Sequence, residues 1–223
     1  IPEDEREKFD NLEPEYSHLY LAASGRLAGV ICIADPLRPE ASRVLRALRG
    51  LGITNTVMMT GDSERTAAAI AKQVGVDRFF AEVLPEDKAA FVQKAKSEGH
   101  TVVMIGDGIN DSPALARADV GLAIGTGADI AKEGADVVLM RSDLMDVARA
   151  IELSRATIRN IKQDLFWALF YNGIGIPLAA GVFFPLTGWQ LSPMFGAAAM
   201  SLSSVCVVSN ALRLKSFKPK VAK

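Results

Sequence analysis

The feature of this sequence that most restricts its fold is a long stretch without charge near the carboxyl end. Residues 165–212 contain no Asp, Glu, Lys or Arg, whereas the residues before them are densely charged. A helix needs about 20 mostly apolar residues to cross a bilayer, so this stretch is long enough for two such helices. Pro185 and Pro193 bound a short interruption, which predicts an α-helical transmembrane hairpin. The alternative is a buried hairpin in a soluble domain, where so long a run without charge is rare.

Basic residues flank the uncharged stretch on both sides and predict its orientation. Three precede it and four follow it: Arg155, Arg159, Lys162, Arg213, Lys215, Lys218 and Lys220. Because short loops rich in Lys and Arg stay in the cytoplasm, we expect both flanks there. The lipid bilayer is then a partner of a multi-pass integral protein of the cell membrane. We expect a stalk helix at 146–164, two transmembrane helices at 165–214 and a basic cytoplasmic tail at 215–223.

The chain before residue 146 alternates between strand and helix patterns. Strands are expected at 18–23, 27–34, 56–59, 79–83, 101–105, 120–124 and 137–140, and helices up to residue 50 and at 63–74, 85–97 and 128–133. Such regular alternation implies a parallel sheet with helices on both faces. The expected fold class is therefore α/β, a Rossmann-like domain with a parallel sheet, followed by the α-helical hairpin.

Charge and cysteine content narrow the possible partners. The formal net charge is −1, which gives no reason to expect nucleic acid as a partner. The two cysteines, Cys32 and Cys206, lie far apart in apolar stretches of different character. We therefore expect no disulfide, and a cytosolic setting for the charged part of the chain.

A glycine-rich turn after one predicted strand carries candidate metal ligands. The strand at 101–105 runs into Gly106 and then Asp107, Asn110 and Asp111. In an open α/β sheet, ligands bind at the carboxyl ends of the strands, and two carboxylates beside an amide suit Mg²⁺. The alternative is that these acidic residues only cap a helix.

Two other predicted strand ends carry groups that suit phosphate. Thr60 follows the strand at 56–59, and Lys88 lies in the first turn of the helix after Leu84-Pro85. A hydroxyl, an ammonium and a pair of carboxylates at one edge can hold the oxygens of a transferring phosphoryl group. Taken alone, Thr60 could cap the next helix and Lys88 could be a solvated lysine, but their joint occurrence favours phosphate chemistry.

Three strings combine these residues: Thr60-Gly61-Asp62, Leu84-Pro85-Glu86-Asp87-Lys88 and Gly106-Asp107-Gly108-Ile109-Asn110-Asp111. Together they resemble the later motifs of the P-type cation-transporting ATPases, which are members of the haloacid-dehalogenase-like superfamily. The resemblance covers residues 19–214. It implies a haloacid-dehalogenase-like phosphorylation domain at 35–145, with 1–34 as the end of a nucleotide-binding domain and hinge strands.

The resemblance also implies ATP and Mg²⁺ as cofactors and a role for each motif residue. Asp107 and Asp111 would bind Mg²⁺ with Asn110 beside them, and Thr60 and Lys88 would hold the phosphoryl oxygens. The nucleotide side would be formed by Gly61, Asp62 and the hinge residues Asp35 and Arg38. The Asp-Lys-Thr-Gly motif, whose aspartate such enzymes phosphorylate, does not occur in the 223 residues. We therefore expect the fragment alone to be inactive, with the remaining domains of the same ATPase as its partners.

The polar and sulfur-bearing side chains of the uncharged stretch suggest which ion is carried. Neither predicted span contains a carboxylate or a lysine, which a path for a hard or divalent ion usually keeps at membrane depth. Thioether and thiol groups instead suit Cu(I). Serine and methionine also serve simply to pack helices in bilayers, and this alternative stays open.

Two further strings, Tyr171-Asn172 and Met200-x-x-Ser203-Ser204, resemble the signature of the copper-transporting branch of the heavy-metal (P1B) ATPases. By this resemblance, Tyr171, Asn172, Met200 and Ser204 would line the path of Cu(I), and a copper chaperone would be a further partner. Cys206 lies outside that pattern and is expected to serve packing. The alternatives are a P-type ATPase of the zinc and cadmium type and a membrane-tethered phosphatase of the same superfamily.

Overall fold

A computed structural model describes most of the chain, in two compact units. The described residues are 16–23, 26–33, 37–106, 110–125, 134–182, 184–188 and 193–222. The units divide between Ala148 and Arg149, and each is considered by itself below. The predicted helix at 128–133 lies outside the described residues.

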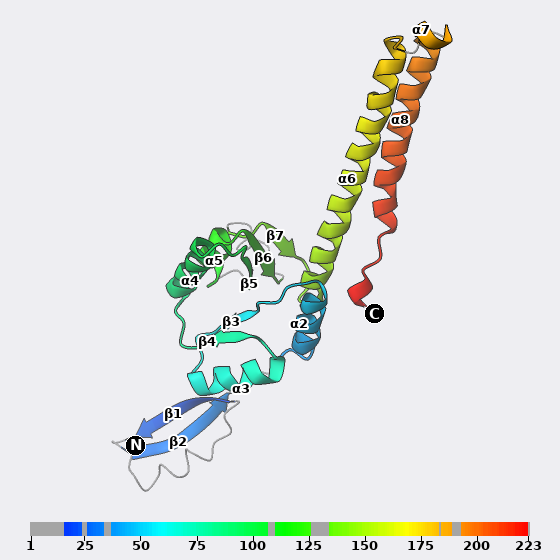
Figure 1. Cartoon of the computed structure of the whole chain (residues 1–223). Helices are drawn as coiled ribbons and strands as arrows, with labels where there is room; N and C mark the ends of the chain where they lie inside the picture. The colour runs from blue at the N-terminus through cyan, green and yellow to red at the C-terminus, as the bar shows by residue number, and fades with distance from the viewer. Residues whose placement is uncertain are drawn as a thin grey trace. The chain divides into compact units, whose positions relative to one another are not determined.

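Strands and helices alternate through the first unit, as the sequence predicts (Figure 1). Its elements are β1 (Ser17–Ala23), β2 (Arg26–Ile33), α2 (Ala41–Gly50), β3 (Val57–Met59), α3 (Glu64–Val74), β4 (Arg78–Phe80), α4 (Pro85–Ser97), β5 (Val103–Gly106), α5 (Ser112–Arg117), β6 (Val120–Ile124) and β7 (Val137–Leu139). The observed bounds follow the predicted ones closely except at β4, and α5 was not predicted as a helix from the sequence. This strand stops early because Glu82, with φ 54°, takes the left-handed conformation that ends extended structure.

After the first hairpin, every pair of neighbouring strands that the structure describes is parallel, which confirms the predicted parallel pairing. β1 and β2 form an antiparallel pair, β3 pairs with β4, and β5, β6 and β7 form a three-stranded ladder. The described parallel strands are therefore divided between two ladders. Met59 at the end of β3 packs against the core of the three-stranded ladder, so the two ladders share buried contacts.

Small side chains let the helices approach the strands closely in this core. Its buried residues are Ala89, Val92, Met104, Ala114, Leu115 and Ala123, from α4, β5, α5 and β6. At Gly121 in β6, a Cβ atom would lie 2.7 Å from the carbonyl oxygen of Leu115 in α5. Only glycine permits this approach, which sets how closely α5 packs on the sheet.

Helices α3 and α4 begin and end where local chemistry dictates. The Ser63 hydroxyl accepts a hydrogen bond from the backbone N–H of Thr66, and Gly75 ends α3 in the left-handed conformation with φ 85°. Pro85 opens α4, where its missing N–H costs nothing. These signals are local, which is why the sequence predicts both helices well.

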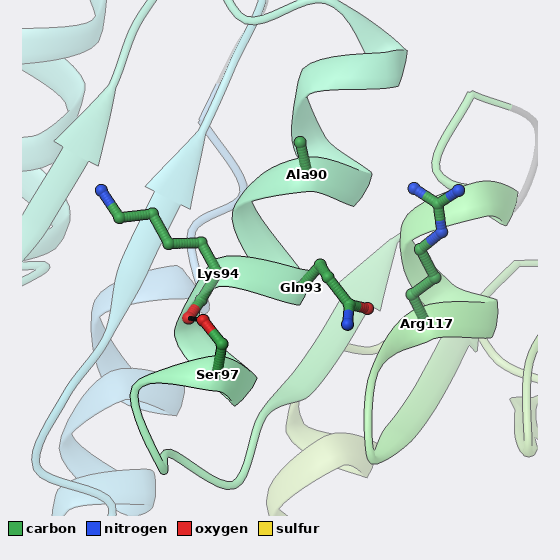
Figure 2. A pocket seen from close by; sticks show the side chains of 5 residues that line it. All are labelled: Ala90, Gln93, Lys94, Ser97 and Arg117. Atoms are coloured by element: carbon green, nitrogen blue, oxygen red, sulfur yellow. Dashed lines mark hydrogen bonds between the residues drawn. The ribbon is translucent and has the colours of Figure 1, made fainter.

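An open groove of about 600 Å³ runs beside the later turns of α4 (Figure 2). Its walls are Ala90, Gln93, Lys94 and Ser97 of α4 and Arg117 at the end of α5. Lys96 fixes this helix pair by donating to the Arg117 carbonyl oxygen at 2.9 Å. The groove is lined by two cationic side chains, but by none of the predicted site residues.

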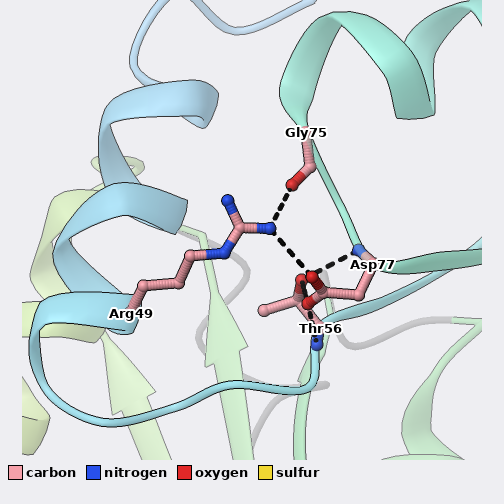
Figure 3. Close-up of polar contacts among 4 residues, drawn as sticks. All are labelled: Arg49, Thr56, Gly75 and Asp77. Atoms are coloured by element: carbon pink, nitrogen blue, oxygen red, sulfur yellow. Dashed lines mark hydrogen bonds and ion pairs between the residues drawn. The ribbon is translucent and has the colours of Figure 1, made fainter.

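At the amino ends of β3 and β4, one carboxylate joins three segments (Figure 3). Asp77 accepts hydrogen bonds from the Thr56 N–H at 2.8 Å and from the Thr56 hydroxyl at 2.5 Å. Arg49 of α2 donates to the same carboxylate at 3.0 Å and to the Gly75 carbonyl oxygen at 2.6 Å. The hydrogen bonds from Thr56, and then Arg49, lower the pKa of the Asp77 carboxyl.

The other ladder repeats this arrangement. Asp119, just before β6, accepts from the Val102 N–H at 2.8 Å and pairs with Lys96 at 3.1 Å. These contacts, led by the Val102 hydrogen bond, lower the pKa of Asp119. Asp136, just before β7, accepts from the Gly121 N–H at 2.8 Å. An aspartate thus precedes each of β4, β6 and β7 and binds a backbone N–H at the start of the neighbouring strand or one residue before it.

The second unit is built on two long helices that lie side by side (Figure 1). α6 (Met145–Ala179) enters this unit and runs unbroken, α7 (Phe184–Thr187) is short, and α8 (Pro193–Arg213) returns. The short 3-10 helices η2 (Leu214–Ser216) and η3 (Lys220–Ala222) follow. Among the described residues, no helix combines the length and the apolar character required to span a bilayer. Insertion of this hairpin into a membrane therefore stays a prediction.

Candidate functional site

Lys88 and Asp111 meet as a sheltered ion pair. Lys88 lies in the first turn of α4, and Asp111 directly precedes α5, after the carboxyl end of β5. The Lys88 ammonium lies 2.8 Å from Asp111 Oδ1, and the two side chains are only 15% and 13% exposed. Since the two residues are 23 positions apart, the fold brings together two groups that the sequence assigned to one site.

The Asp111 side chain is not used as a helix cap. Its backbone carbonyl accepts from Ala114 and Leu115 in the first turn of α5, but its carboxylate makes no capping hydrogen bond. The carboxylate instead packs over Gly106, where a Cβ atom would lie 2.5 Å from Asp111 Oδ2 and 2.6 Å from its Cβ. Gly106 therefore leaves the space that the carboxylate occupies, and the capping alternative for Asp111 is wrong.

Thr60 and Asp62 form a tight turn after β3. The Thr60 hydroxyl donates to Asp62 Oδ2 at 2.7 Å and accepts from the Asp62 N–H at 3.1 Å. Because Ser63 supplies the cap of α3, the capping alternative for Thr60 is also wrong. The Thr60 backbone binds Phe80 and Val83, so this turn is fixed to the segment that leads into α4 and Lys88.

The remaining predicted residues of this site are placed as follows. Gly61, in the turn after β3, and Asn110 are exposed. Arg38 donates to the carbonyl oxygen of Ser142, just before α6, so its guanidinium binds within the same unit. Asp35 and Asp107 lie outside the described residues. No cluster of three or more His, Cys, Asp or Glu side chains that could hold a metal occurs among the residues that the structure describes.

In the helical hairpin, one predicted residue meets a sulfur atom. The Tyr171 hydroxyl of α6 lies 3.9 Å from Cys206 Sγ of α8. Asn172 and Ser204 are exposed, and Met200 lies on α8 one turn before Ser204. Cys206 lies outside the sequence signature and was expected to serve packing, and its contact with Tyr171 joins the two helices.

A second interhelical contact was missed by the sequence analysis. Asn210 of α8 donates to Asp164 Oδ1 of α6 at 2.8 Å, and Arg213 donates to the Asn210 side-chain oxygen at 2.9 Å. Asp164 is the last charged residue before the uncharged stretch. Its only sequence signal is this position, since nothing local identifies a partner 46 residues away.

Comparison with known proteins identifies the class. Residues 3–119 match the haloacid dehalogenase-like hydrolases, and residues 88–151 match a second family with the same description. The chain therefore belongs to the haloacid dehalogenase-like hydrolases.

The individual relatives with high identity are transporting P-type ATPases. The chain is 57% identical to copper-transporting ATPase 2 of Rhizobium meliloti (strain 1021) over 203 residues, which are 91% of this chain and 24% of that protein. It is 51% identical to a silver exporting P-type ATPase of Salmonella typhimurium, over 90% of this chain and 24% of that protein. The chain thus spans about a quarter of the length of these curated relatives.

A solved structure covers both units of the chain. The crystal structure of a zinc-transporting PIB-type ATPase in the E2.Pi state matches with a TM-score of 0.76 and 36% identity, over 96% of this chain and 34% of that one. These similarities confirm the predicted resemblance to the heavy-metal P-type ATPases.

Proposed function

We propose that this chain is part of an ATP-driven pump that exports monovalent copper across a membrane through an aspartyl-phosphate intermediate. The observation that carries this proposal is the sheltered Lys88–Asp111 pair at the carboxyl ends of the strands. It supports a phosphate site, and the 57% identity to a copper-transporting ATPase supports the ion. The aspartate that accepts the phosphoryl group belongs to the Asp-Lys-Thr-Gly motif, which these 223 residues do not contain.

Each side chain of the site has a role in phosphoryl transfer, which depends on positioning and charge neutralisation. Lys88 donates to a phosphoryl oxygen, and Asp111 holds the Lys88 ammonium in place until phosphate arrives. The Thr60 hydroxyl donates to Asp62 in this structure and turns to a second phosphoryl oxygen. Asp62 and Gly61 face the nucleotide side in this proposal, together with Asp35 and Arg38.

The donor at Asp111 fits Mg²⁺, the cofactor that the family implies. Lys88 binds its Oδ1 oxygen, while its Oδ2 oxygen lies against Gly106 at the end of β5. Asp111 and Asp107 would hold the ion, with Asn110 beside them, since hard cations prefer carboxylate oxygens. Bound Mg²⁺ supplies positive charge that neutralises the phosphoryl oxygens.

The helical hairpin supplies the ion path in this proposal. Tyr171, Asn172, Met200 and Ser204 line it, and the Tyr171–Cys206 contact adds a thiol beside the Tyr171 hydroxyl. Sulfur ligands favour a soft monovalent cation. The two helices would cross the cell membrane, with the α/β unit and the carboxyl terminus in the cytoplasm. A copper chaperone and the other domains of the pump would be its protein partners.

A zinc pump is the second candidate, because the structural match is to a zinc-transporting ATPase. The absence of a carboxylate or lysine from residues 165–212 argues against it. A phosphatase of the same superfamily is less well supported, since relatives that match nine tenths of the chain are transporting ATPases.

The test measures ATP hydrolysis by the full-length protein in lipid vesicles. We expect stimulation by Cu(I) and Ag(I), and a loss of roughly tenfold in metal-stimulated activity for Met200→Ala, since each 1.4 kcal/mol of lost binding is about tenfold. The conservative Met200→Cys keeps a sulfur ligand and should retain more activity. Stimulation by Zn²⁺ alone would reject the copper assignment.

A further inference from the structure

The contact between α6 and α8 is made by small and polar side chains more than by large apolar ones. The partly buried residues in the middle of the two helices are Asp164, Ala168, Tyr171 and Gly175 on α6 and Ser203, Cys206, Val207 and Asn210 on α8. The large apolar side chains around them are exposed, among them Leu165, Phe166, Leu169, Val205 and Val208. Because apolar packing has no fixed direction, the polar contacts between the helices decide how the two are aligned.

The side chain of Asn210 on α8 is held from two sides. Its nitrogen donates to Asp164 Oδ1 at 2.8 Å and to the main-chain oxygen of Asn160 at 3.5 Å. Its oxygen accepts from the Arg213 guanidinium at 2.9 Å. The donor and the acceptor of this amide are thus both engaged. Since Asp164 and Arg213 carry opposite charges, each strengthens the hydrogen bond that it makes with the amide.

These bonds fix the alignment of α8 along α6. Asn160 and Asp164 are four residues apart, so they are neighbours on one face of α6 and lie about 6 Å apart along its axis. Asn210 binds both. A shift of α8 by one helical turn, about 5.4 Å, would separate Asn210 from these partners and leave the partly buried Asp164 carboxylate without its donor.

The same alignment decides which residue of α8 meets Tyr171. Tyr171 follows Asp164 by seven residues, or two turns, so it lies on the same side of α6, about 10 Å further along. Cys206 precedes Asn210 by four residues and shares its side of α8. In this alignment Cys206 Sγ lies 3.9 Å from the Tyr171 hydroxyl. A shift by one turn would bring Ser203 or Asn210 to Tyr171, and so replace sulfur by a hydroxyl or an amide.

We propose that Asp164 is a positioning residue of the ion path, which through Asn210 holds α8 in the register that places the Cys206 thiol beside the Tyr171 hydroxyl. The inference rests on the proposed function, in which Tyr171 lines the path of a soft monovalent cation. A thiol beside Tyr171 suits such a cation better than the hydroxyl or amide of the shifted alignments. Asp164 acts through its acceptor oxygen, and its negative charge only strengthens the bond.

The test links the two helices chemically in the full-length protein in lipid vesicles. Tyr171→Cys places a second thiol near Cys206, and dibromobimane joins two thiols only when they lie close together. Peptide mass spectrometry then measures how fast positions 171 and 206 are linked. Asp164→Ala in this background should slow the linking about threefold or more, the effect of one interhelical hydrogen bond in a bilayer. Gln163→Ala, at the exposed neighbouring position, is the matched control and should not slow it.

Asp164→Asn separates the hydrogen bond from the charge. Because asparagine keeps an acceptor oxygen, we expect linking at the rate of the Tyr171→Cys parent. Asn210→Ala should slow the linking as Asp164→Ala does, and the double variant should lose nothing more, since both changes remove one interaction. Linking at the parental rate in Asp164→Ala would overturn the proposal. Equal slowing in Asp164→Asn would do so too, because it would assign the effect to charge.

A role in the ion path also predicts an effect on transport kinetics. With Tyr171 intact, Asp164→Ala should raise the KM for Cu(I) in stimulated ATP hydrolysis about threefold or more, with kcat nearly unchanged, and Asp164→Asn should restore it. An unchanged KM would reject the role in the path. The linking reaction requires neither metal nor ATP. Slower linking without any Cu(I)-stimulated ATPase would therefore keep the register role of Asp164 and reject the proposed pump.

Discussion

The two edges of the parallel ladders both carry aspartates, but they use them differently. At the amino edge, Asp77, Asp119 and Asp136 each accept a hydrogen bond from a backbone N–H at or directly before the start of the neighbouring strand. At the carboxyl edge, Asp111 pairs with the side chain of Lys88 and Asp62 pairs with the hydroxyl of Thr60.

The difference suggests that the aspartates at the amino edge stabilise the fold, whereas those at the carboxyl edge are candidates for binding a ligand. A backbone N–H at the end of a ladder cannot leave without breaking the strand, so a carboxylate bound to it stabilises the fold. A lysine ammonium or a threonine hydroxyl can rotate to a ligand at small cost, so the partners at the carboxyl edge are exchangeable. The same residue type is thus a structural clamp at one edge and a candidate ligand group at the other.

The largest expected effect comes from removing the exchangeable cation. Lys88→Met in the full-length protein should lower ATP hydrolysis about 10²–10³-fold, the usual loss when one charged donor to a transition state is removed. The far-ultraviolet circular dichroism spectrum should not change. Lys94→Met on the same helix is the control and should keep wild-type activity. An activity within threefold of wild type for Lys88→Met would show that this edge is not a phosphate site.

A smaller effect is expected when the same edge is disturbed without removing any charge. Gly106→Ala places a methyl group where the Asp111 carboxylate lies, so Asp111 must move away from Lys88. Overpacking of this kind costs typically 1–3 kcal/mol of stability, and we expect a roughly tenfold loss of ATPase activity in addition. Gly50→Ala is the matched control, because a Cβ there meets nothing within 4 Å. Equal melting temperatures and activities for the two variants would contradict the geometry.

The smallest effect, at the amino edge, is on stability against acid. The pKa values of Asp77 and Asp119 lie below their usual value of 3.8 in the folded state, so the unfolded chain binds more protons at acid pH. Their contribution to stability is present above that value and is lost as the pH falls through the folded pKa. The melting temperature should therefore fall more steeply between about pH 5 and pH 2 for the wild type than for Asp77→Asn. Parallel curves would exclude a stabilising role for the Asp77 carboxylate, and ATPase activity at neutral pH should be nearly unchanged in the variant.

Much of the α/β unit follows from local sequence, and the exceptions have physical causes. The bounds of α3 and α4 could be predicted because Ser63, Gly75 and Pro85 act within one turn of chain. The early end of β4 could not, because the positive φ of Glu82 depends on its hydrogen bond to the Asp62 carbonyl, 20 residues earlier. The division of the parallel strands into two ladders could likewise not be predicted from the sequence, since strand pairing depends on residues far apart in sequence.

The candidate site shows the same division. The motifs identified Thr60, Lys88 and Asp111 because each follows a strand, and parallel strands end at one edge. They left open whether Thr60 and Asp111 were helix caps, and only the hydrogen bonds of Asp62, Ser63 and Lys88 excluded this. The roles of these residues in catalysis, and those of Tyr171, Asn172, Met200 and Ser204 in ion transport, stay predictions.

The sequence by itself determined the alternation of strands and helices, the residues at the strand ends and the two uncharged helical segments, because each depends on neighbours within a few positions. The tertiary structure alone decided which aspartates hold strands and which meet exchangeable side chains. It also decided that Glu152 binds the tail and that Cys206 meets Tyr171. Apart from the bond between Thr60 and Asp62, these contacts join residues 15 to 69 positions apart. No local pattern encodes them, because a carboxylate or a thiol has the same local sequence signal whatever partner the fold brings to it.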